Sequence, residues 1–346
     1  MATRSRPTIR EVAALAGVSH QTVSRVINGS ERVNADTRER VEIAITELGY
    51  QPNAIARSMA RGRTYTLACI APNLTDFTYA SIIEGAEIES RSQGYFLLTA
   101  SAPDEKNFNT LIEQLFGSRR AEGLLVITPY IDHQHTQPHH DVPTVYVGAD
   151  PHQEHTSLVT LDNTAAGLLA TQHLIELGHQ RIAHIIGPRI EDSAQDRLEG
   201  YRTALDIAGL CPDLRLIVEG DWSATSGYRA VNRLYDQKVS FSAIFAQNDR
   251  MAIGAIRALR ELGIKVPDAV SVIGFDDMPL ASYFDPPLTT IKQDTLLMGS
   301  EAAQLLIRLI EHPEGEKTSI YLPGELVIRH STATIPSIGD KEVSAK

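Results

Sequence analysis

The sequence is poor in cysteine and in long apolar runs. Its 346 residues include two cysteines, Cys69 and Cys211. Two are too few for a disulfide framework, and because both adjoin apolar runs we expect reduced core residues. No 18-residue apolar run occurs, which argues against a membrane span. The N-terminus lacks the apolar segment of a secretory signal, so these absences together predict a cytoplasmic protein.

The sequence also lacks the short motifs of common nucleotide and metal enzymes. No GxGxxG, Walker loop or HExxH occurs, which argues against an NAD-type enzyme and a metalloprotease. Clustered histidines at 133–140, HQHTQPHH, could bind Zn²⁺ or Ni²⁺, but the proline favours a plain surface loop. The pair Asp276 and Asp277 could serve acid/base catalysis, yet nothing nearby resembles a nucleophile. We therefore expect no catalytic residue, no cofactor and no metal.

Acidic residues outnumber basic ones in the chain as a whole, but not in its first part. The net charge is −11, from 32 Lys and Arg against 43 Asp and Glu. Residues 1–63 contain 10 Lys and Arg against 6 Asp and Glu, a net +4, which leaves −15 for the remainder. A basic head on an acidic body predicts that only the head contacts nucleic acid. The hydrophobic content of 42% is enough for a large buried core.

Residues 8–28, TIREVAALAGVSHQTVSRVIN, predict two short helices joined by a tight turn. Gly17 suits the turn because it takes positive φ without a Cβ clash, and Ser19 is an expected N-cap of the second helix. The first helix carries an apolar stripe at i, i+3, i+4 and i+7, formed by Ile9, Val12, Ala13 and Ala16. The spacing is typical of a helix-turn-helix.

The second helix has an apolar face for packing and a polar face that points outward. Val23, Val26 and Ile27 form the apolar stripe. The polar stripe is Gln21, Ser24, Arg25 and Asn28. Gln can bind adenine bidentately and Arg can bind guanine, so this face suits the DNA major groove. The plainer alternative is a small helical hairpin with a solvated face.

A third amphipathic helix and a linker follow. Asn34 is the expected cap, and an apolar stripe runs through Val41, Ala44, Ile45 and Leu48. Pro52 stops this helix. Residues 51–63 then predict either a short helix, marginal by itself in water, or a flexible tether.

From residue 64 onward short apolar runs alternate with helical stretches. This alternation predicts parallel sheets covered by helices on both faces. The expected strands are 66–71, 95–99, 123–127, 144–147, 181–186, 216–218, 243–245 and 270–275. Several polar residues follow these strands, where open α/β sheets bind ligands, and they suit the hydroxyls of a sugar. Trp222, the sole tryptophan, is either a core filler or a flat surface for an apolar sugar face.

Six motifs in order resemble the lactose-repressor family of bacterial transcription regulators. They are the head at 8–28, LIELGHQRIAHIIG at 174–187, GDWSATSG at 220–227, AQNDRMAIGA at 246–255, SVIGFDD at 271–277 and PPLTTIKQD at 286–294. The resemblance covers residues 8–333. It implies an all-α helix-turn-helix headpiece (1–50), a hinge helix (51–63), an α/β effector-binding and dimerisation core (64–335) and a tail (336–346).

The resemblance further implies that the core is two Rossmann-like lobes, as in a periplasmic sugar-binding protein. The first lobe covers about 64–161 and 293–322, and the second about 162–292 and 323–335. The chain would cross between them near residues 161, 292 and 322. The tail lacks leucine heptads, so we expect a homodimer without a C-terminal tetramer bundle.

Individual side chains match functional positions of the family. His20, Gln21 and Arg25 match base-reading positions, and Ala56 and Met59 match the hinge residues that enter the minor groove. The DNA-backbone positions are matched by Thr8, Ser19, Thr22, Ser24 and Asn28. The effector-binding positions are matched by Asp76, Thr78, Tyr79, Ile82, Asp162, Arg197, Trp222, Asn248 and Asp276.

Four departures from the family's namesake concern specificity. His20 replaces a tyrosine, which leaves the operator sequence open. Met59 replaces the wedging leucine, and its apolar side chain should still wedge. Thr295 replaces a phenylalanine beside the ligand and Asp76 replaces an apolar residue. The pocket is therefore more polar, and the identity of the sugar stays open.

The function implied is a repressor of carbohydrate-utilisation genes. Two chains would place their recognition helices on a pseudo-palindromic operator in double-stranded DNA, and a small sugar, a galactoside or a glucoside, would release them. The alternative is a purine or phosphorylated corepressor that strengthens DNA binding. A sugar-transport protein would share the core fold but should carry an export signal in place of the DNA-reading head.

Overall fold

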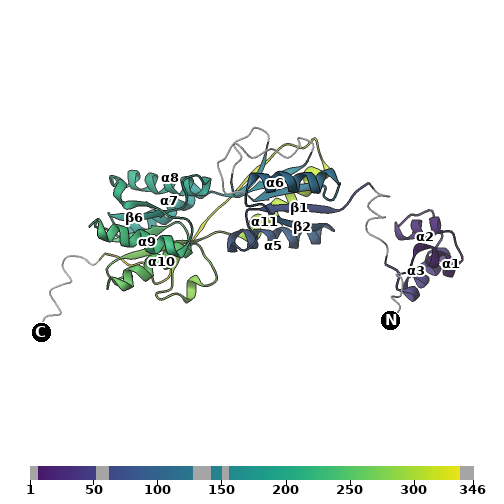
Figure 1. Cartoon of the computed structure of the whole chain (residues 1–346), viewed down its shortest axis with the longest axis horizontal. Helices are drawn as coiled ribbons and strands as arrows, with labels where there is room; N and C mark the ends of the chain where they lie inside the picture. Colours follow the sequence, from purple (N-terminus) through teal and green to yellow (C-terminus); the bar gives the residue numbers. More distant parts are fainter. Residues whose placement is uncertain (1–6, 52–61, 128–141, 150–155, 336–346) are drawn as a thin grey trace. The chain divides into compact units, whose positions relative to one another are not determined.

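The structure is a computed structural model that describes residues 7–51, 62–127, 142–149 and 156–335. The chain forms two compact units, Met1–Tyr65 and Thr66–Lys346. Each unit has its own core and is described by itself. Figure 1 labels their elements in chain order.

The described residues of the first unit form three helices whose ends follow from the sequence. Thr8 caps the first helix in a capping box with Glu11, Ser19 caps the second, and Gly17 takes φ +67° between them. Asn34 caps the third helix. The helices are α1 (Ile9–Ala16), α2 (His20–Ile27) and α3 (Ala35–Leu48). Their shared core is Val12, Ala13, Ala16, Val23, Val26, Val41 and Ala44.

The first lobe of the second unit is a six-stranded parallel sheet in the order β11-β5-β4-β3-β1-β2. Its strands are β1 (Thr66–Ala71), β2 (Phe96–Ser101), β3 (Gly123–Ile127), β4 (Thr144–Val147), β5 (Ser157–Leu161) and β11 (Ser319–Leu322). Its helices are α5 (Phe77–Ser92), α6 (Glu105–Ile112), which continues into a π-helical turn at Glu113–Gly117, and α11 (Thr295–Glu311). In Figure 1, α5 and α6 cover opposite faces of this sheet.

The second lobe is a six-stranded sheet in the order β12-β10-β9-β8-β6-β7, parallel except for β12. Its strands are β6 (Ile182–Ile186), β7 (Ile217–Glu219), β8 (Ala243–Ala246), β9 (Ser271–Asp276), β10 (Thr289–Lys292) and β12 (Glu325–Val327). Its helices are α7 (Asn163–Glu176), α8 (Asp192–Ile207), α9 (Ala224–Asp236) and α10 (Asp249–Glu261), with 3₁₀ turns at Leu214–Leu216 and Ala281–Tyr283. Figure 1 shows α7 and α8 on one face of this sheet and α9 and α10 on the other.

The chain passes between the two lobes three times. It leaves the first lobe after β5, returns after β10 and leaves again after β11. Because each crossing follows the carboxyl end of a strand, the ligand-binding edges of the two sheets face the crossings. This topology confirms the expected fold, an α-helical headpiece followed by an α/β core of two Rossmann-like lobes.

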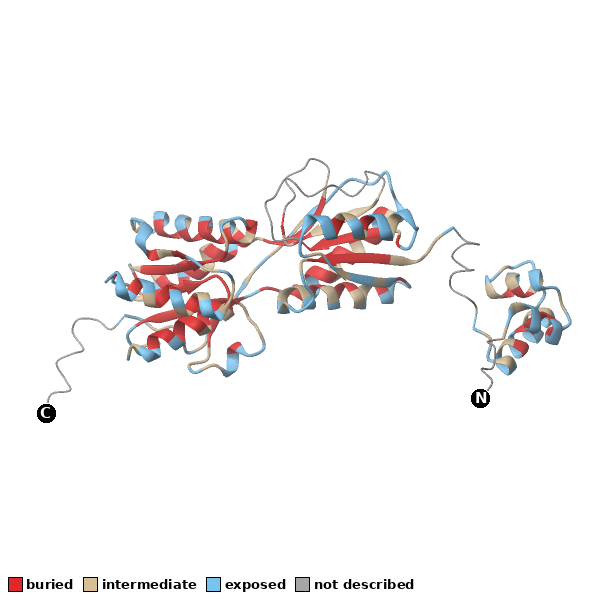
Figure 2. Ribbon diagram, in the orientation of Figure 1, coloured by how far each residue is buried: buried red, intermediate tan, exposed pale blue. Residues whose placement is uncertain are grey.

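The central strands of each sheet lie in the interior of their lobe, where Figure 2 shows them in red, whereas the edge strands β2, β11 and β12 contain no buried residue. All five residues of β3, β5 and β6 are buried, as expected for parallel strands covered on both faces. The eight expected strands are present with ends shifted by up to two residues. The sequence analysis missed β5, β10, β11 and β12, because these strands are short or rich in Ser and Thr.

The expectation for one cysteine was wrong. Cys69 is buried in β1, but Cys211 is exposed, because it lies between Leu210 and Pro212 in the connection after α8. Both are free thiols.

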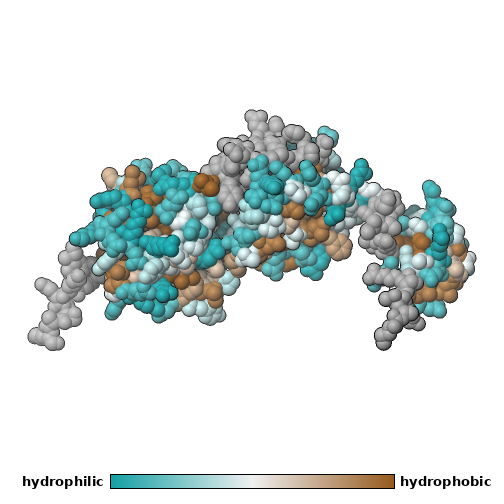
Figure 3. All heavy atoms as spheres, in the orientation of Figure 1, coloured by the Kyte–Doolittle hydropathy of each residue, from teal (hydrophilic) through white to brown (hydrophobic). Residues whose placement is uncertain are grey.

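On the face drawn in Figure 3, the described residues are mostly hydrophilic, with small apolar patches between them. No described helix is both long and apolar enough to cross a membrane.

Candidate functional site

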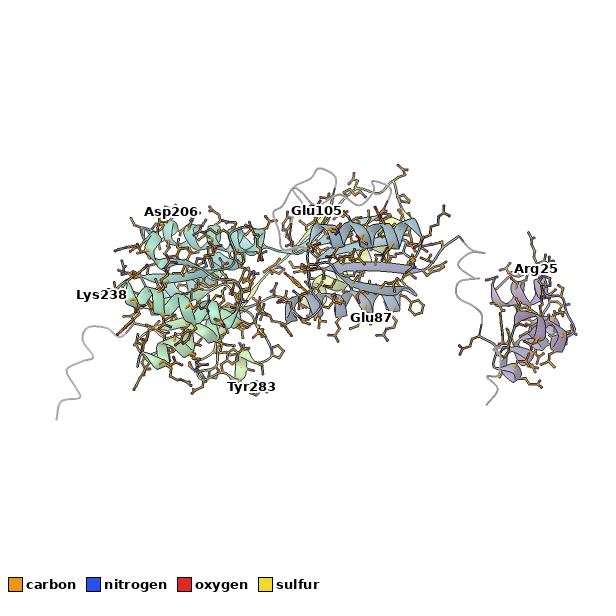
Figure 4. All side chains as sticks on the ribbon, in the orientation of Figure 1. Arg25, Glu87, Glu105, Asp206, Lys238 and Tyr283 are labelled. Carbon is orange, nitrogen blue, oxygen red and sulfur yellow. The ribbon has the colours of Figure 1, made fainter. Side chains whose placement is uncertain are left out.

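The outward face of α2 presents an open row of polar side chains. Val23 and Val26 are buried against the other helices, so the opposite side of α2 faces solvent. Figure 4 shows the Arg25 side chain extending away from the three-helix unit. The exposed residues of this face are His20, Gln21, Arg25 and Asn28. Three of the four side chains can donate two hydrogen bonds to a base edge or a phosphate.

Some of the side chains matched to DNA-backbone positions also hold the helices together. The Thr8 hydroxyl lies 2.9 Å from the Glu11 carboxylate, to which it donates, and the Ser19 hydroxyl accepts from the Thr22 backbone N–H. The Asn28 side chain lies 3.4 Å from the Ser24 hydroxyl. These residues therefore stabilise the ends of α1 and α2. Ala56 and Met59 lie outside the described residues, as does the histidine-rich run at 133–140.

A cavity lies between the two lobes, where the carboxyl ends of several strands meet. About 90 Å³ inside it is open to water, several times the space that a single buried water needs. Its polar lining residues are Asp76, Thr78, Tyr79, Thr160, Asn163, Glu191, Ser193, Arg197, Trp222, Asn248, Arg250, Asp276 and Gln293. Its apolar lining includes Ile82, Ile127, Val147, Leu161 and Met298. This mixture of hydroxyls, amides, carboxylates and guanidiniums can hydrogen-bond a polyhydroxylated ligand.

Arg197 and Asp276 form the charged floor of the cavity. The Arg197 guanidinium donates to the Asn163 side chain at 2.9 Å and to the Gln247 backbone carbonyl at 2.6 Å. It also stacks on the Phe275 ring at 3.6 Å. Burial lowers the pKa of Arg197 to about 10, so it stays charged at neutral pH. Asp276, which ends β9 with φ +110°, accepts from Gln293 at 2.7 Å.

Burial also controls the protonation of the cavity carboxylates. It raises the pKa of Asp276 to about 7, against the attraction of Arg197. Asp249, behind the cavity floor, accepts from the Thr290 hydroxyl at 2.7 Å, and burial with the repulsion of Asp276 raises its pKa to about 8. Both carboxyls therefore hold a proton more tightly than an exposed aspartate does.

Trp222 forms one wall and is fixed by three neighbours. Its indole N–H donates to Glu191 at 2.8 Å, and the Asn248 amide donates to its backbone carbonyl at 3.0 Å. Its ring lies against Gly187, where an added Cβ would be 2.1 Å from a ring atom. Trp222 takes φ +65°, a conformation unusual for a bulky residue and often found at functional sites.

One ion pair joins the two lobes at the cavity. Asp76 follows β1 in the first lobe and caps α5 through the Thr78 backbone N–H at 3.0 Å. Its other carboxylate oxygen accepts from Arg250 of α10, in the second lobe, at 2.6 Å.

The structure gathers eight of the nine residues matched to effector-binding positions around one cavity. Asp162 does not line it, because its carboxylate caps α7 through the Ala165 backbone N–H. Its neighbour Asn163 lines the cavity instead. The Asn248 side chain already has two partners, since its amide nitrogen donates to the Trp222 backbone carbonyl and its amide oxygen accepts from the Met251 backbone N–H. Thr295 is buried and does not line the cavity.

Sequence reasoning missed Glu191, Arg250 and Gln293. Gln293 lies inside the motif PPLTTIKQD at 286–294, but it follows β10, which was not predicted as a strand, so its place at the carboxyl edge of the sheet was not recognised. Glu191 precedes α8 and is marked by no local pattern. Arg250 lies inside α10 and within the motif AQNDRMAIGA at 246–255, of which only Asn248 was assigned to the effector.

We expect the emission of Trp222 to change with pH near neutrality. Burial raises the pKa of Glu191 to about 7, against the opposing hydrogen bond from Trp222. As the pH falls through 7, Glu191 takes up a proton and the indole N–H then faces a neutral carboxyl. An emission titration should show a step near pH 7 that Glu191→Gln removes. Glu219→Gln, at an exposed ion pair with Arg189, is the matched control, and a step that persists in Glu191→Gln would contradict the assignment.

The same proton affects stability. Glu191 binds its proton more tightly in the folded chain than at its ordinary pKa of 4.5. Its contribution to stability is therefore full below pH 4.5 and is lost as the pH rises through about 7. As the pH rises from 5 to 8, the natural protein should therefore lose stability that Glu191→Gln does not lose. The free energy of unfolding of Glu191→Gln, measured relative to that of the natural protein, should increase over this range.

Comparison with known proteins assigns each unit separately. The family model of bacterial regulatory proteins, lacI family, matches residues 8–53. The model of the periplasmic binding protein-like domain matches residues 171–332.

Whole-length relatives are transcription regulators. The HTH-type transcriptional regulator CelR of Thermobifida fusca is 39% identical over 340 residues, 96% of this chain and 100% of the relative. The HTH-type transcriptional repressor PurR of Haemophilus influenzae (strain PittEE) is 37% identical over 340 residues, 95% of this chain and 99% of the relative. The ribose operon repressor of Escherichia coli (strain K12) is 37% identical over 328 residues, 94% of this chain and 99% of the relative.

Solved structures give the same result. The Lac repressor dimer bound to operator and the anti-inducer ONPF has a TM-score of 0.87 at 32% identity, over 95% of this chain and 100% of that one. The complex of CelR with cellobiose has a TM-score of 0.73 at 38% identity, over 94% of this chain and 100% of that one.

Proposed function

Because this chain belongs to the lacI family of bacterial regulatory proteins, we propose that it is a repressor released from its operator by a small neutral sugar. Membership makes it a DNA-binding transcription regulator and not an enzyme. The observation that supports a sugar as the effector is the composition of the cavity, where the Trp222 ring lies among hydrogen-bonding carboxylates and amides.

Two relatives support a sugar as effector. One is solved with cellobiose and one is named for the ribose operon, and the flat indole with nearby acceptors suits a pyranose or furanose ring. A glucoside or galactoside fits the same chemistry. The alternative, a purine or phosphorylated corepressor that strengthens DNA binding, is supported by the similarity to PurR.

The DNA site is the outward face of α2. In this proposal His20, Gln21 and Arg25 contact base edges, and Thr8, Ser19, Thr22, Ser24 and Asn28 contact the backbone. Two chains pair, as in the operator-bound Lac repressor dimer, so that two copies of α2 read a pseudo-palindromic site. Residues 1–50 form the headpiece, residues 51–63 the hinge with Ala56 and Met59 at the minor groove, and residues 64–335 the effector-binding core. The protein works in the cytoplasm, where its operator is.

The sugar would act through the two lobes. A ligand shifts an equilibrium between two conformations only by its different affinity for each. The cavity is lined from both lobes, so a bound sugar favours one lobe arrangement, and the lobes are continuous with the hinge. Loss of the paired hinge state then lowers the affinity for DNA.

Titration of the purified protein with ribose, cellobiose, galactosides and purines, followed by Trp222 emission, tests the proposal. A saturable change with a neutral sugar, accompanied by release of labelled operator DNA, supports it. Trp222→Phe should bind operator but give no emission change. A response to purines alone, with tighter DNA binding, would favour the corepressor alternative.

Arg25→Ala should relax operator recognition. A bidentate contact between Arg and guanine discriminates against the wrong base by about 1–3 kcal/mol. We expect the Kd ratio between a selected operator and a variant with one guanine replaced to shrink correspondingly. Arg40→Ala removes the same charge from α3 of the same unit and should preserve the ratio. An unchanged ratio in Arg25→Ala would remove the assignment of α2 as the reading helix.

A further inference from the structure

We infer that Asp76 makes the cavity selective for uncharged ligands, because its carboxylate occupies the accessible guanidinium of Arg250. The inference rests on the proposed function, in which this cavity binds the effector. It names Asp76 as the residue that excludes phosphorylated and carboxylated sugars, and Arg250 as the group through which an anion would otherwise bind.

Among the described residues that line the cavity, two are arginines, and Arg250 is the more open of the two to a ligand. The side chain of Arg250 is 39% exposed. Arg197 is buried, donates to Asn163 and Gln247 and is stacked on Phe275. An anion that enters the cavity would therefore find its accessible donors on Arg250, and guanidiniums bind phosphate and carboxylate bidentately.

Asp76 already holds that position. Its carboxylate oxygen lies 2.6 Å from the Arg250 guanidinium, and its side chain is only 15% exposed. The other oxygen caps α5 through Thr78, which fixes the carboxylate in place. An incoming anion would have to displace a preorganised carboxylate, whereas a neutral hydroxyl can donate to Asp76 without breaking the pair.

The charge of Asp76 is felt across the cavity. Burial is the main cause of the raised pKa values of Glu191 and Asp276, and the negative charge of Asp76 adds to both. An anionic ligand would be repelled by Asp76 and, to the extent that they are ionised, by Glu191 and Asp276 as well. Without Asp76, the fixed charge near Arg250 becomes more positive by one unit.

Asparagine is the sharpest replacement for Asp76. Asn is as good an N-cap as Asp, so Asp76→Asn keeps the cap of α5 and removes only the charge. Asp104→Asn is the matched control, since Asp104 caps α6 of the same lobe and does not line the cavity. Arg250→Gln and the double variant Asp76→Asn with Arg250→Gln complete the set.

Calorimetric titration with inorganic phosphate, and with ribose and cellobiose each beside its monophosphate, tests the inference. The natural protein and Asp104→Asn should bind neutral sugar and reject the phosphates. Asp76→Asn should bind inorganic phosphate saturably and gain about tenfold or more for the phosphorylated sugar over its neutral parent. Arg250→Gln and the double variant should show no such gain.

The outcomes separate this inference from the proposed function. If the natural protein binds neutral sugar and Asp76→Asn still rejects phosphate, the inference fails and the proposed function stands. The inference also fails if the double variant accepts phosphate as well as Asp76→Asn does, because Arg250 would then not be the anion's partner. If the natural protein itself binds the phosphorylated sugar better than the neutral one, both fail.

Discussion

Gly187→Ala is expected to weaken effector binding by about 30-fold, close to 2 kcal/mol, while operator binding stays intact. A Cβ at this position would lie 2.1 Å and 2.2 Å from two atoms of the Trp222 ring. Two non-bonded carbon atoms cannot approach so closely, so the ring must move. Its hydrogen bond to Glu191 and its place in the cavity wall would then be lost.

The backbone itself tolerates this substitution. Gly187 does not have a positive φ, so alanine adds a steric contact and no dihedral strain. The measurement combines a sugar titration with Trp222 emission, which should shift in the absence of ligand. Gly117→Ala, where an added Cβ meets nothing within 4 Å, is the control. A normal sugar affinity in Gly187→Ala would mean that Trp222 does not form part of the binding wall.

Asp276→Ala should abolish induction, with effector affinity lowered by about 100-fold, near 3 kcal/mol. The carboxylate is lost as an acceptor for sugar hydroxyls, and buried Arg197 loses its largest favourable charge interaction. Operator binding should persist because the three-helix unit has its own core. The measurement is release of labelled operator as sugar is added.

A second variant separates the chemistry of Asp276 from its backbone conformation. At φ +110° alanine is strained, whereas asparagine tolerates positive φ better. Asp276→Asn also keeps an oxygen that can accept from Gln293. Its loss of affinity should therefore be smaller than that of alanine, with a melting temperature near that of the natural protein. Release of DNA by Asp276→Ala at ordinary sugar concentrations would contradict the assignment.

The prediction of the three-helix unit succeeded because its information is local. The caps Thr8, Ser19 and Asn34 each accept from the backbone N–H three residues on. The turn at Gly17 needs one positive φ. The 3.6-residue period then decides which side of α2 is buried, and so leaves the side with Arg25 exposed.

The missed strands show where such local patterns end. Strand β10 contains Thr289 and Thr290, which are buried although polar. Thr290 donates to Asp249, and the Thr289 hydroxyl lies 3.1 Å from that of Thr332. These partners come from other elements. The polar run therefore suggests a loop when only the sequence is considered, whereas in the fold its hydroxyls find partners and it forms a buried strand.

The sequence by itself determined which face of α2 is exposed, the alternation of strands and helices, and the edge of the sheets at which the cavity lies. Only the tertiary structure decided which side chains meet there. Asp76 and Arg250 are separated by 174 positions, and Glu191 and Trp222 by 31. Periodicity records which way a side chain points from its own element, but a partner in another element depends on how the elements pack. The charge of the cavity, and therefore the kind of ligand it admits, depends on that packing.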